Sequence, residues 1–148
     1  MPEQETLERA EQDKREGKSP STQAGEFVRE EIHHIREGKH GAASAKQAVA
    51  IGLSKARRAG VDLAPPKKGR VSEETRKSAE RDSRKGRSRK KAVSARRSRG
   101  TKAALKREPR SAASHKALSR QAKSAARTRK KSGTVTQSRR THSRRKAA

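Results

Sequence analysis

Residues 21–60 decide the fold, and they read STQAGEFVREEIHHIREGKHGAASAKQAVAIGLSKARRAG. In the first half of this stretch, apolar residues recur at steps of four, four and three, the spacing that places side chains on one face of a helix. These residues are Ala24, Val28, Ile32 and Ile35, with Phe27 at the flank. Because glycine readily adopts the left-handed conformation that ends helices, we expect this first helix to stop at Gly38.

A second helix is expected to begin after Ser44, because Gln47 follows three residues later. In this capping-box spacing, each side chain can accept a hydrogen bond from the other residue's backbone N–H. The helix should run to about Ala59, with Gly60 as its left-handed cap. One side of it carries mostly small residues: Ala45, Ala48, Val49, Gly52, Leu53 and Ala56. Small side chains let helices approach closely, so we expect residues 21–65 to form an antiparallel helical hairpin.

This hairpin has few large apolar residues, so its core needs support from elsewhere. We expect Val61 and Leu63 to fold back onto it, or the hairpin to associate with a second copy or another protein. The preceding segment, residues 1–20, is acidic, and within residues 3–16 Leu7 is the only large apolar anchor. It is therefore expected to form only a marginal helix.

Positive charge is confined to the second part of the chain. The 148 residues include 42 Lys or Arg and 16 Asp or Glu, for a net charge of +26. Residues 1–65 hold 11 of each sign, so the entire excess lies beyond Pro65. Hydrophobic residues make up 26% of the chain, against about 45–50% in a typical globular domain. The predicted fold class is mostly α: a small N-terminal helical hairpin, then a long and largely disordered basic tail, residues 66–148, with nascent helices.

The tail contains the candidate nucleic-acid-binding residues. They are Arg84, Lys85, Arg87, Arg89, Lys90, Lys91, Arg96, Arg97, Arg99, Lys102, Lys106, Arg107, Lys116, Arg120, Lys123, Arg127, Arg129, Lys130, Lys131, Arg139, Arg140, Arg144 and Arg145. Five of them, from Lys116 to Lys130, follow one another at steps of four, three, four and three, so on a helix they form one cationic stripe. We expect that stripe to become helical when a polyanion neutralises it.

Lys and Arg neutralise phosphates and release counterions without reading a sequence, which predicts largely sequence-nonspecific, histone-like binding. Tyr and Trp are absent and Phe27 is the single aromatic residue, so the stacking platforms of single-strand binders are missing. Nucleic acid is therefore the expected partner, with DNA favoured over RNA. An RNA- or ribosome-associated factor, or a stress-protective basic protein, is the alternative function, and a helix-turn-helix DNA reader is an alternative for the hairpin. A membrane-surface helix is disfavoured because the stripe segment has Leu118 as its only large apolar residue.

Catalysis is not expected, because a chain with so little apolar material cannot build a dry cleft that holds paired reactive groups. The absence of Cys removes thiolate metal sites. Glu30 with His33, and Glu31 with His34, have the Glu-x-x-His spacing of metal-binding bundles, but the second helix offers no further carboxylate. We interpret these residues as a solvated helix face, with His33, His34 and His40 able to bind a metal only weakly. No metal site, cofactor or small-molecule substrate is predicted.

Three runs carry a resemblance to a known family: Gly25 to Ile32, His34 to Gly41, and Lys46 to Ala56. Together they resemble a bacterial family of small basic proteins of unknown function, often labelled DNA-binding, over about residues 15–70. The tail resembles, in composition only, the tails of linker histones and bacterial histone-like proteins. The resemblance implies a bacterial protein of the cytoplasm, associated with the nucleoid. Because the N-terminus is acidic and no apolar run follows it, we expect neither a signal peptide nor a transmembrane helix.

Overall fold

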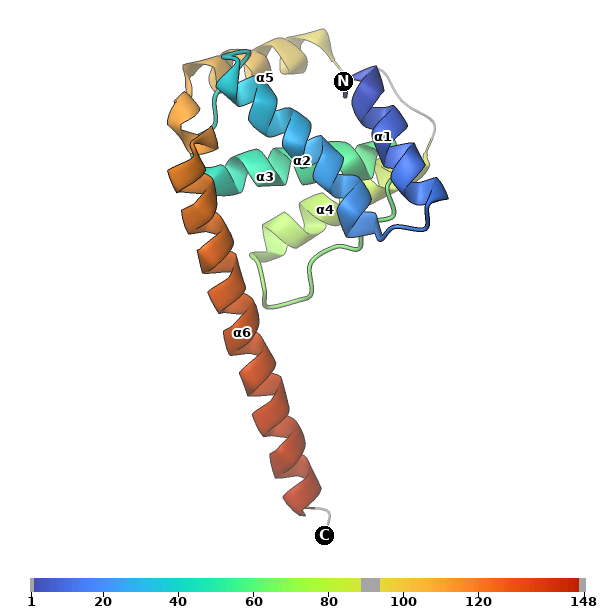
Figure 1. Cartoon of the computed structure of the whole chain (residues 1–148), viewed down its shortest axis with the longest axis vertical. Helices are drawn as coiled ribbons and strands as arrows, with labels where there is room; N and C mark the ends of the chain where they lie inside the picture. The colour runs from blue at the N-terminus through green and yellow to red at the C-terminus, as the bar shows by residue number, and fades with distance from the viewer. Residues whose placement is uncertain (1, 89–93, 147–148) are drawn as a thin grey trace.

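The structure, a computed structural model, describes residues 2–88 and 94–146, and for residues 131–146 it describes the backbone alone. Helices dominate the described residues, and no strand occurs among them. In chain order the helices are α1 (Gln4–Arg15), α2 (Pro20–Arg36), α3 (Ala45–Ala59), α4 (Glu73–Arg87), α5 (Ala95–Arg107), the 3₁₀ turn η1 (Arg110–Ala113) and α6 (His115–Lys146). Helices α1 to α5 gather in one body, and α6 projects away from it (Figure 1).

Helices α2 and α3 pack on each other where the sequence predicts a helical hairpin, but they belong to a larger helical body that also includes α1, α4 and η1. The ends of both helices are set by local capping. Ser44 caps α3 by accepting a hydrogen bond from the backbone N–H of Gln47 at 3.2 Å. The Gln47 side chain accepts from the N–H of Ala43, one residue earlier than the predicted capping box requires. At the other ends, Gly38 and Gly60 have φ values of 79° and 103°, as the expected left-handed caps should.

The two helices of the hairpin approach closely at Gly52. A Cβ atom placed on Gly52 would lie 2.6 Å from the Cα of Val28, which is shorter than any tolerable contact. Ala48 and Ala56, one turn to either side of Gly52, are fully buried. The small residues of α3 therefore set the spacing of the hairpin, as the sequence predicts.

In the described part of the chain, two small apolar clusters form the core. The first contains Ala10, Ala24, Phe27 and Ala56, with Leu7, Leu53, Val61 and Leu63 packed against it. Val61 and Leu63 thus fold back as expected. Helix α1 contributes two residues to this cluster, Leu7 and Ala10, where the sequence indicates Leu7 alone. The second cluster contains Ile35, Ala42, Ala48, Ala112 and Ala113, with Ile32 packed against it. Ala112 and Ala113 belong to η1, so a segment of the basic tail completes the core of the hairpin.

The predicted long, largely disordered tail is wrong. Formed helices continue through α4, α5 and α6, and the tail is fastened to the hairpin by backbone contacts that hydrophobicity does not reveal. The N–H of Gly41 donates to the carbonyl of Leu105 at 2.8 Å, and the guanidinium of Arg36 donates to the carbonyl of Ala113 at 3.0 Å. On the other side, Gly86 of α4 lies against the carbonyl oxygen of Arg57, so closely that a Cβ there would be 2.0 Å from it.

Local pairing explains why α4 forms despite its polar sequence. Ser72 caps its first turn by accepting from the N–H of Thr75 at 3.3 Å. Arg76 forms ion pairs with Glu73 and Glu80, three and four residues away on the same helix face. Asp82 also reaches Arg58 of α3 at 3.2 Å. Opposite charges therefore offset the repulsion that leads the sequence to predict disorder in this part of the tail.

Candidate functional site

The cationic stripe predicted from its spacing lies on α6. Its first four members, Lys116, Arg120, Lys123 and Arg127, are all exposed, as is Lys130. Glu108 is the only acidic residue after Asp82, so α6 contains no carboxylate that could neutralise the stripe from within the helix. Ser114 starts the helix by accepting a hydrogen bond from the N–H of Ala117 at 3.2 Å. Because α6 is already helical in the free chain, the expectation that the stripe folds only on a polyanion is wrong.

Helix α5 presents a second group of cations. All six basic candidates on it are exposed: Arg96, Arg97, Arg99, Lys102, Lys106 and Arg107. Like α6, this helix has no acidic residue. Leu105 is its half-buried apolar residue, and the carbonyl of Leu105 is the acceptor that binds Gly41. Thus α5 is attached by its backbone while its charged side chains remain in solvent.

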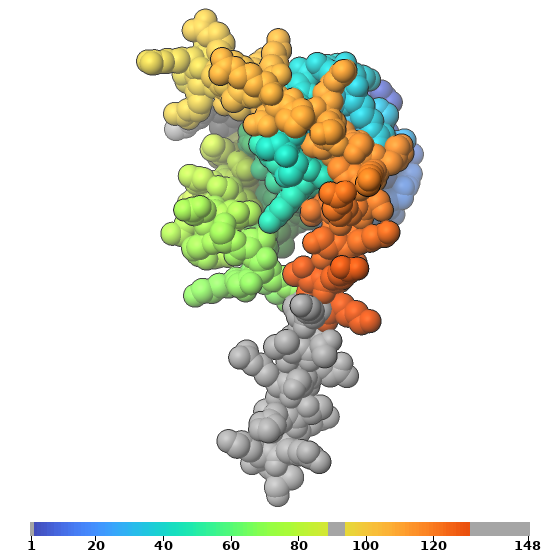
Figure 2. Space-filling view, turned by 90° about the vertical axis from the view of Figure 1, so that its left-hand side faces the viewer, coloured from blue at the N-terminus to red at the C-terminus, as the bar shows by residue number. Residues whose placement is uncertain are grey.

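Helix α4 differs because its charges are partly compensated. Arg84 and Lys85 are exposed, but the guanidinium of Arg87 lies 2.6 Å from the carboxylate of Asp62. Arg76, on the same helix, is also paired. Helix α4 therefore differs from α5 and α6, whose sequences contain no carboxylate that could pair with their cations from within the helix. Figure 2 shows long side chains projecting from α4 and from the start of α6, with α3 between these helices.

Some candidates cannot be placed. Arg89, Lys90 and Lys91 lie outside the described residues, and so do the side chains of Lys131, Arg139, Arg140, Arg144 and Arg145. Arg129 is exposed on α6 beside the stripe. Reasoning from sequence also overlooked Arg36, whose bond to the carbonyl of Ala113 seats η1 and so fixes where α6 begins. No spacing or motif signals a role for this residue, because its partner is a backbone atom.

Glu30 and Glu31 of α2 form a buried polar cluster with Lys55 of α3, at a position where the sequence predicts a solvated helix face. That interpretation is wrong for two members of the face, because Glu30 is 4% exposed and Glu31 is fully buried. Lys55 of α3 reaches both, with its Nζ 3.3 Å from Glu30 Oε1 and 2.6 Å from Glu31 Oε2. On the other side of Glu31, the Nε2 of His40 lies 3.3 Å from Oε1. The carboxylates are tolerated in the interior because cationic and imidazole partners surround them.

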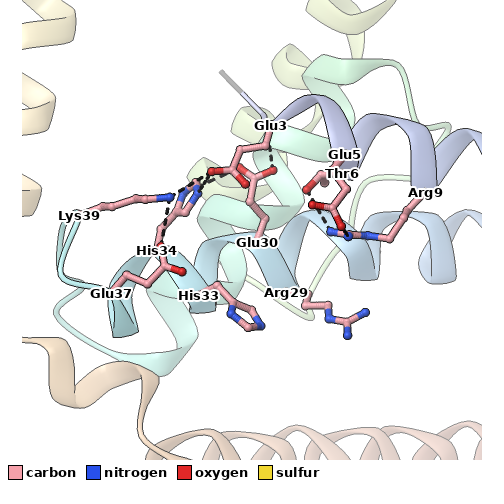
Figure 3. Close-up of a pocket in the computed structure, with 10 residues that line it drawn as sticks. All are labelled: Glu3, Glu5, Thr6, Arg9, Arg29, Glu30, His33, His34, Glu37 and Lys39. Atoms are coloured by element: carbon pink, nitrogen blue, oxygen red, sulfur yellow. Dashed lines mark hydrogen bonds and ion pairs between the residues drawn. The ribbon is translucent and has the colours of Figure 1, made fainter.

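The N-terminus of the chain closes this cluster. Glu3 Oε1 lies 2.8 Å from His34 Nε2 and 3.1 Å from Lys39 Nζ, and the backbone N–H of Glu3 donates to Glu30 at 3.1 Å. The hydrogen bonds to the Glu3 carboxylate, the one from His34 first, lower the pKa of Glu3 to about 2. Figure 3 shows Glu3, Glu30, His34 and Lys39 converging, whereas His33 on the same helix points away from them. Of the adjacent histidines, only His34 joins the cluster.

Comparison with known proteins gives one match. The profile of a family of unknown function (DUF6496) matches residues 14–68, which include α2 and α3. No match was found among curated proteins or among solved structures. The buried cluster around Glu31 thus lies largely within the matched region, and the cationic stripe of α6 lies outside it.

The length and hydropathy of the helices show whether any of them could span a membrane. Within residues 2–88 and 94–146, none of the helices is both long enough and apolar enough to cross a bilayer.

Proposed function

We propose that this protein is a non-enzymatic, largely sequence-nonspecific DNA-binding protein of the histone-like kind. The observation that carries the proposal is the stripe of α6, where Lys116, Arg120, Lys123 and Arg127 are exposed on a helix without carboxylates. Each such cation can neutralise a phosphate and release a condensed counterion. The proposed setting is the bacterial nucleoid.

The shape of the helix favours duplex DNA over duplex RNA. The major groove of B-DNA admits an α-helix, whereas that of A-form RNA is too narrow for side chains to enter. The 32 residues of α6 extend for about 48 Å at 1.5 Å per residue, so the helix can follow several phosphates along one duplex. Phe27, the only aromatic residue of the chain, is 1% exposed and cannot stack on an unpaired base.

In this proposal, the hairpin of α2 and α3 positions the DNA-binding helix and does not itself bind DNA. Arg36, Gly41 and the apolar residues around Ile35 hold η1, so they fix the position from which α6 starts. The hairpin itself is proposed to position the cationic helices and to contact a second copy or a protein partner.

The test compares two triple variants of the full chain that lose the same residue types and the same charge. The stripe variant is Lys116→Gln, Arg120→Gln and Lys123→Gln. The control variant is Lys14→Gln, Arg15→Gln and Lys46→Gln, three exposed residues of α1 and α3. Affinity for a duplex of mixed sequence is measured by fluorescence anisotropy across a salt series. The slope of log K against log salt should fall by about 0.9 for each phosphate that the variant no longer neutralises, and only in the stripe variant.

The outcomes separate the proposal from its alternatives. An equal fall in affinity in the two variants would mean that net charge alone attracts DNA. That result would contradict the proposal that the α6 stripe is the DNA-binding surface. A large preference for one DNA sequence would favour a helix-turn-helix reader. Competition with structured RNA at the same salt tests the ribosome-associated alternative, since RNA that displaces DNA at equal concentration would reverse the predicted preference.

A further inference from the structure

Three residues with metal-ligating side chains meet inside the molecule. The ligand atoms of Glu31, His34 and His40 all lie within 4.8 Å of one another. Glu31 and His34 come from α2, and His40 from the connection between α2 and α3. An ion placed among them is within reach of all three after small side-chain rotations.

Each histidine is oriented in the way that metal-ligating histidines usually are. His34 uses Nε2 to bind the carboxylate of Glu3 at 2.8 Å, and His40 uses Nδ1 to bind the carbonyl of Gly41 at 3.1 Å. Metal ligands of this type commonly donate one ring N–H to a carboxylate or a backbone carbonyl, which leaves the other nitrogen for the ion. The two rings are inclined at 81° with centroids 6.2 Å apart, so they do not stack on each other.

The carboxylate of Glu31 gives the independent observation. It is fully buried, and neither of its oxygens has a hydrogen-bond partner in the part of the chain that the structure describes. Lys55 Nζ lies 2.6 Å from Oε2 and His40 Nε2 lies 3.3 Å from Oε1, but neither contact has the alignment of a hydrogen bond. A buried carboxylate left in that state costs free energy, which a positive ion bound directly to it would offset.

We propose that Glu31, His34 and His40 bind a divalent transition-metal ion such as Zn²⁺. Two imidazoles and one carboxylate make a donor set that Zn²⁺ accepts, with the fourth position open to water. The charges of the buried carboxylates agree with this proposal, because Lys55 is the one Lys or Arg among the described residues that pairs with Glu30 and Glu31. The bound ion would link α2 to the connection that carries Gly41 and Ala42, whose N–H groups hold the tail at Leu105 and Pro109. Metal would thereby stabilise the whole molecule, whether or not it binds DNA.

The test uses the untagged full-length chain and Co²⁺ or Zn²⁺ alone as the probe. Co²⁺ should bind in a ratio of one ion per chain and give a ligand-field absorption band, and Zn²⁺ should displace it and raise the midpoint of thermal unfolding. His34→Gln and His40→Gln should each weaken binding about tenfold or more, as removal of groups in a metal site does. His33→Gln is the matched control, because His33 is exposed and points away from the cluster.

Circular dichroism of the metal-free variants shows whether each of them still folds, and titration of the unaltered chain tests the site independently of any variant. Absence of Co²⁺ binding by the unaltered chain would overturn the proposal. So would binding that His40→Gln leaves unchanged, which would indicate exposed histidines such as His115. Weakening in His33→Gln equal to that in His34→Gln would overturn it as well.

Discussion

Gly52 is the residue that determines how closely α2 and α3 pack. A methyl group at this position meets the backbone of Val28, which cannot move without shifting the whole helix. We predict that Gly52→Ala lowers the free energy of unfolding by about 1–3 kcal/mol through overpacking. Urea unfolding followed by circular dichroism measures the change.

Gly25 supplies the control for that prediction. It is exposed on α2, and a Cβ there would have nothing within 4 Å. Gly25→Ala should therefore stabilise the protein by up to about 1 kcal/mol, the difference in helix propensity between the two residues. If both substitutions stabilise the protein, α2 and α3 do not approach at Gly52.

At the scale of the element, the closest backbone approach between α4 and α3 is at Gly86, beside the ion pair of Asp82 with Arg58. Gly86 lies against the carbonyl oxygen of Arg57, and a Cβ atom on Gly86 would be only 2.0 Å from that oxygen. Gly86→Ala should force α4 away from α3 and lower the free energy of unfolding by about 1–3 kcal/mol. Gly100→Ala on α5, where a Cβ meets nothing within 4 Å, should be neutral or stabilising by up to about 1 kcal/mol.

This pair of variants also distinguishes a docked tail from a disordered one. In a disordered tail both substitutions act only on local helix propensity, so both would raise helicity and neither would lower stability. Equal behaviour of the two variants in chemical denaturation would therefore contradict the contact between α4 and α3.

Helix ends could be predicted from the sequence because capping is local. Ser44 and Gly60 act within a few residues of their own positions, and the structure confirms both. The burial of Glu30 and Glu31 could not be predicted, since their spacing matches a solvated face as well as a buried one. The burial of these carboxylates depends on Lys55, which pairs with them from α3 and lies 24 residues after Glu31 in the sequence.

For the molecule as a whole, two amides report whether the tail is attached. The N–H of Gly41 donates to Leu105 at 2.8 Å and that of Ala42 to Pro109 at 3.2 Å. Both amides lie in the connection between α2 and α3, outside any helix, so their acceptors come from the tail alone. We predict that hydrogen exchange of both is slowed in the full chain relative to unstructured peptide. Exchange at the unstructured rate would show that the tail is detached.

The attachment of the tail could not be read from the sequence because its contacts leave no hydrophobic pattern. They are made by glycines, alanines, backbone carbonyls and charged side chains such as Arg36. Ala112 and Ala113 look like the many other alanines of the tail. That the α6 stripe lies on one helix face, by contrast, follows from its spacing. The pairing of Arg87 with Asp62 joins two parts of the chain that the sequence treats as separate, so it could be found only in three dimensions.

The clusters around Phe27 and Ile35 consist mainly of alanines, with few large apolar side chains. Unfolding such a core exposes little apolar surface, while it also exposes buried polar groups such as Glu31 and Thr6. Apolar exposure raises the heat capacity of the unfolded chain and polar exposure lowers it, so the two contributions partly cancel here. The heat-capacity change per residue should therefore be smaller than in ordinary globular domains. Since that change sets the curvature of stability against temperature, this molecule should lose stability only gradually on cooling and resist cold denaturation.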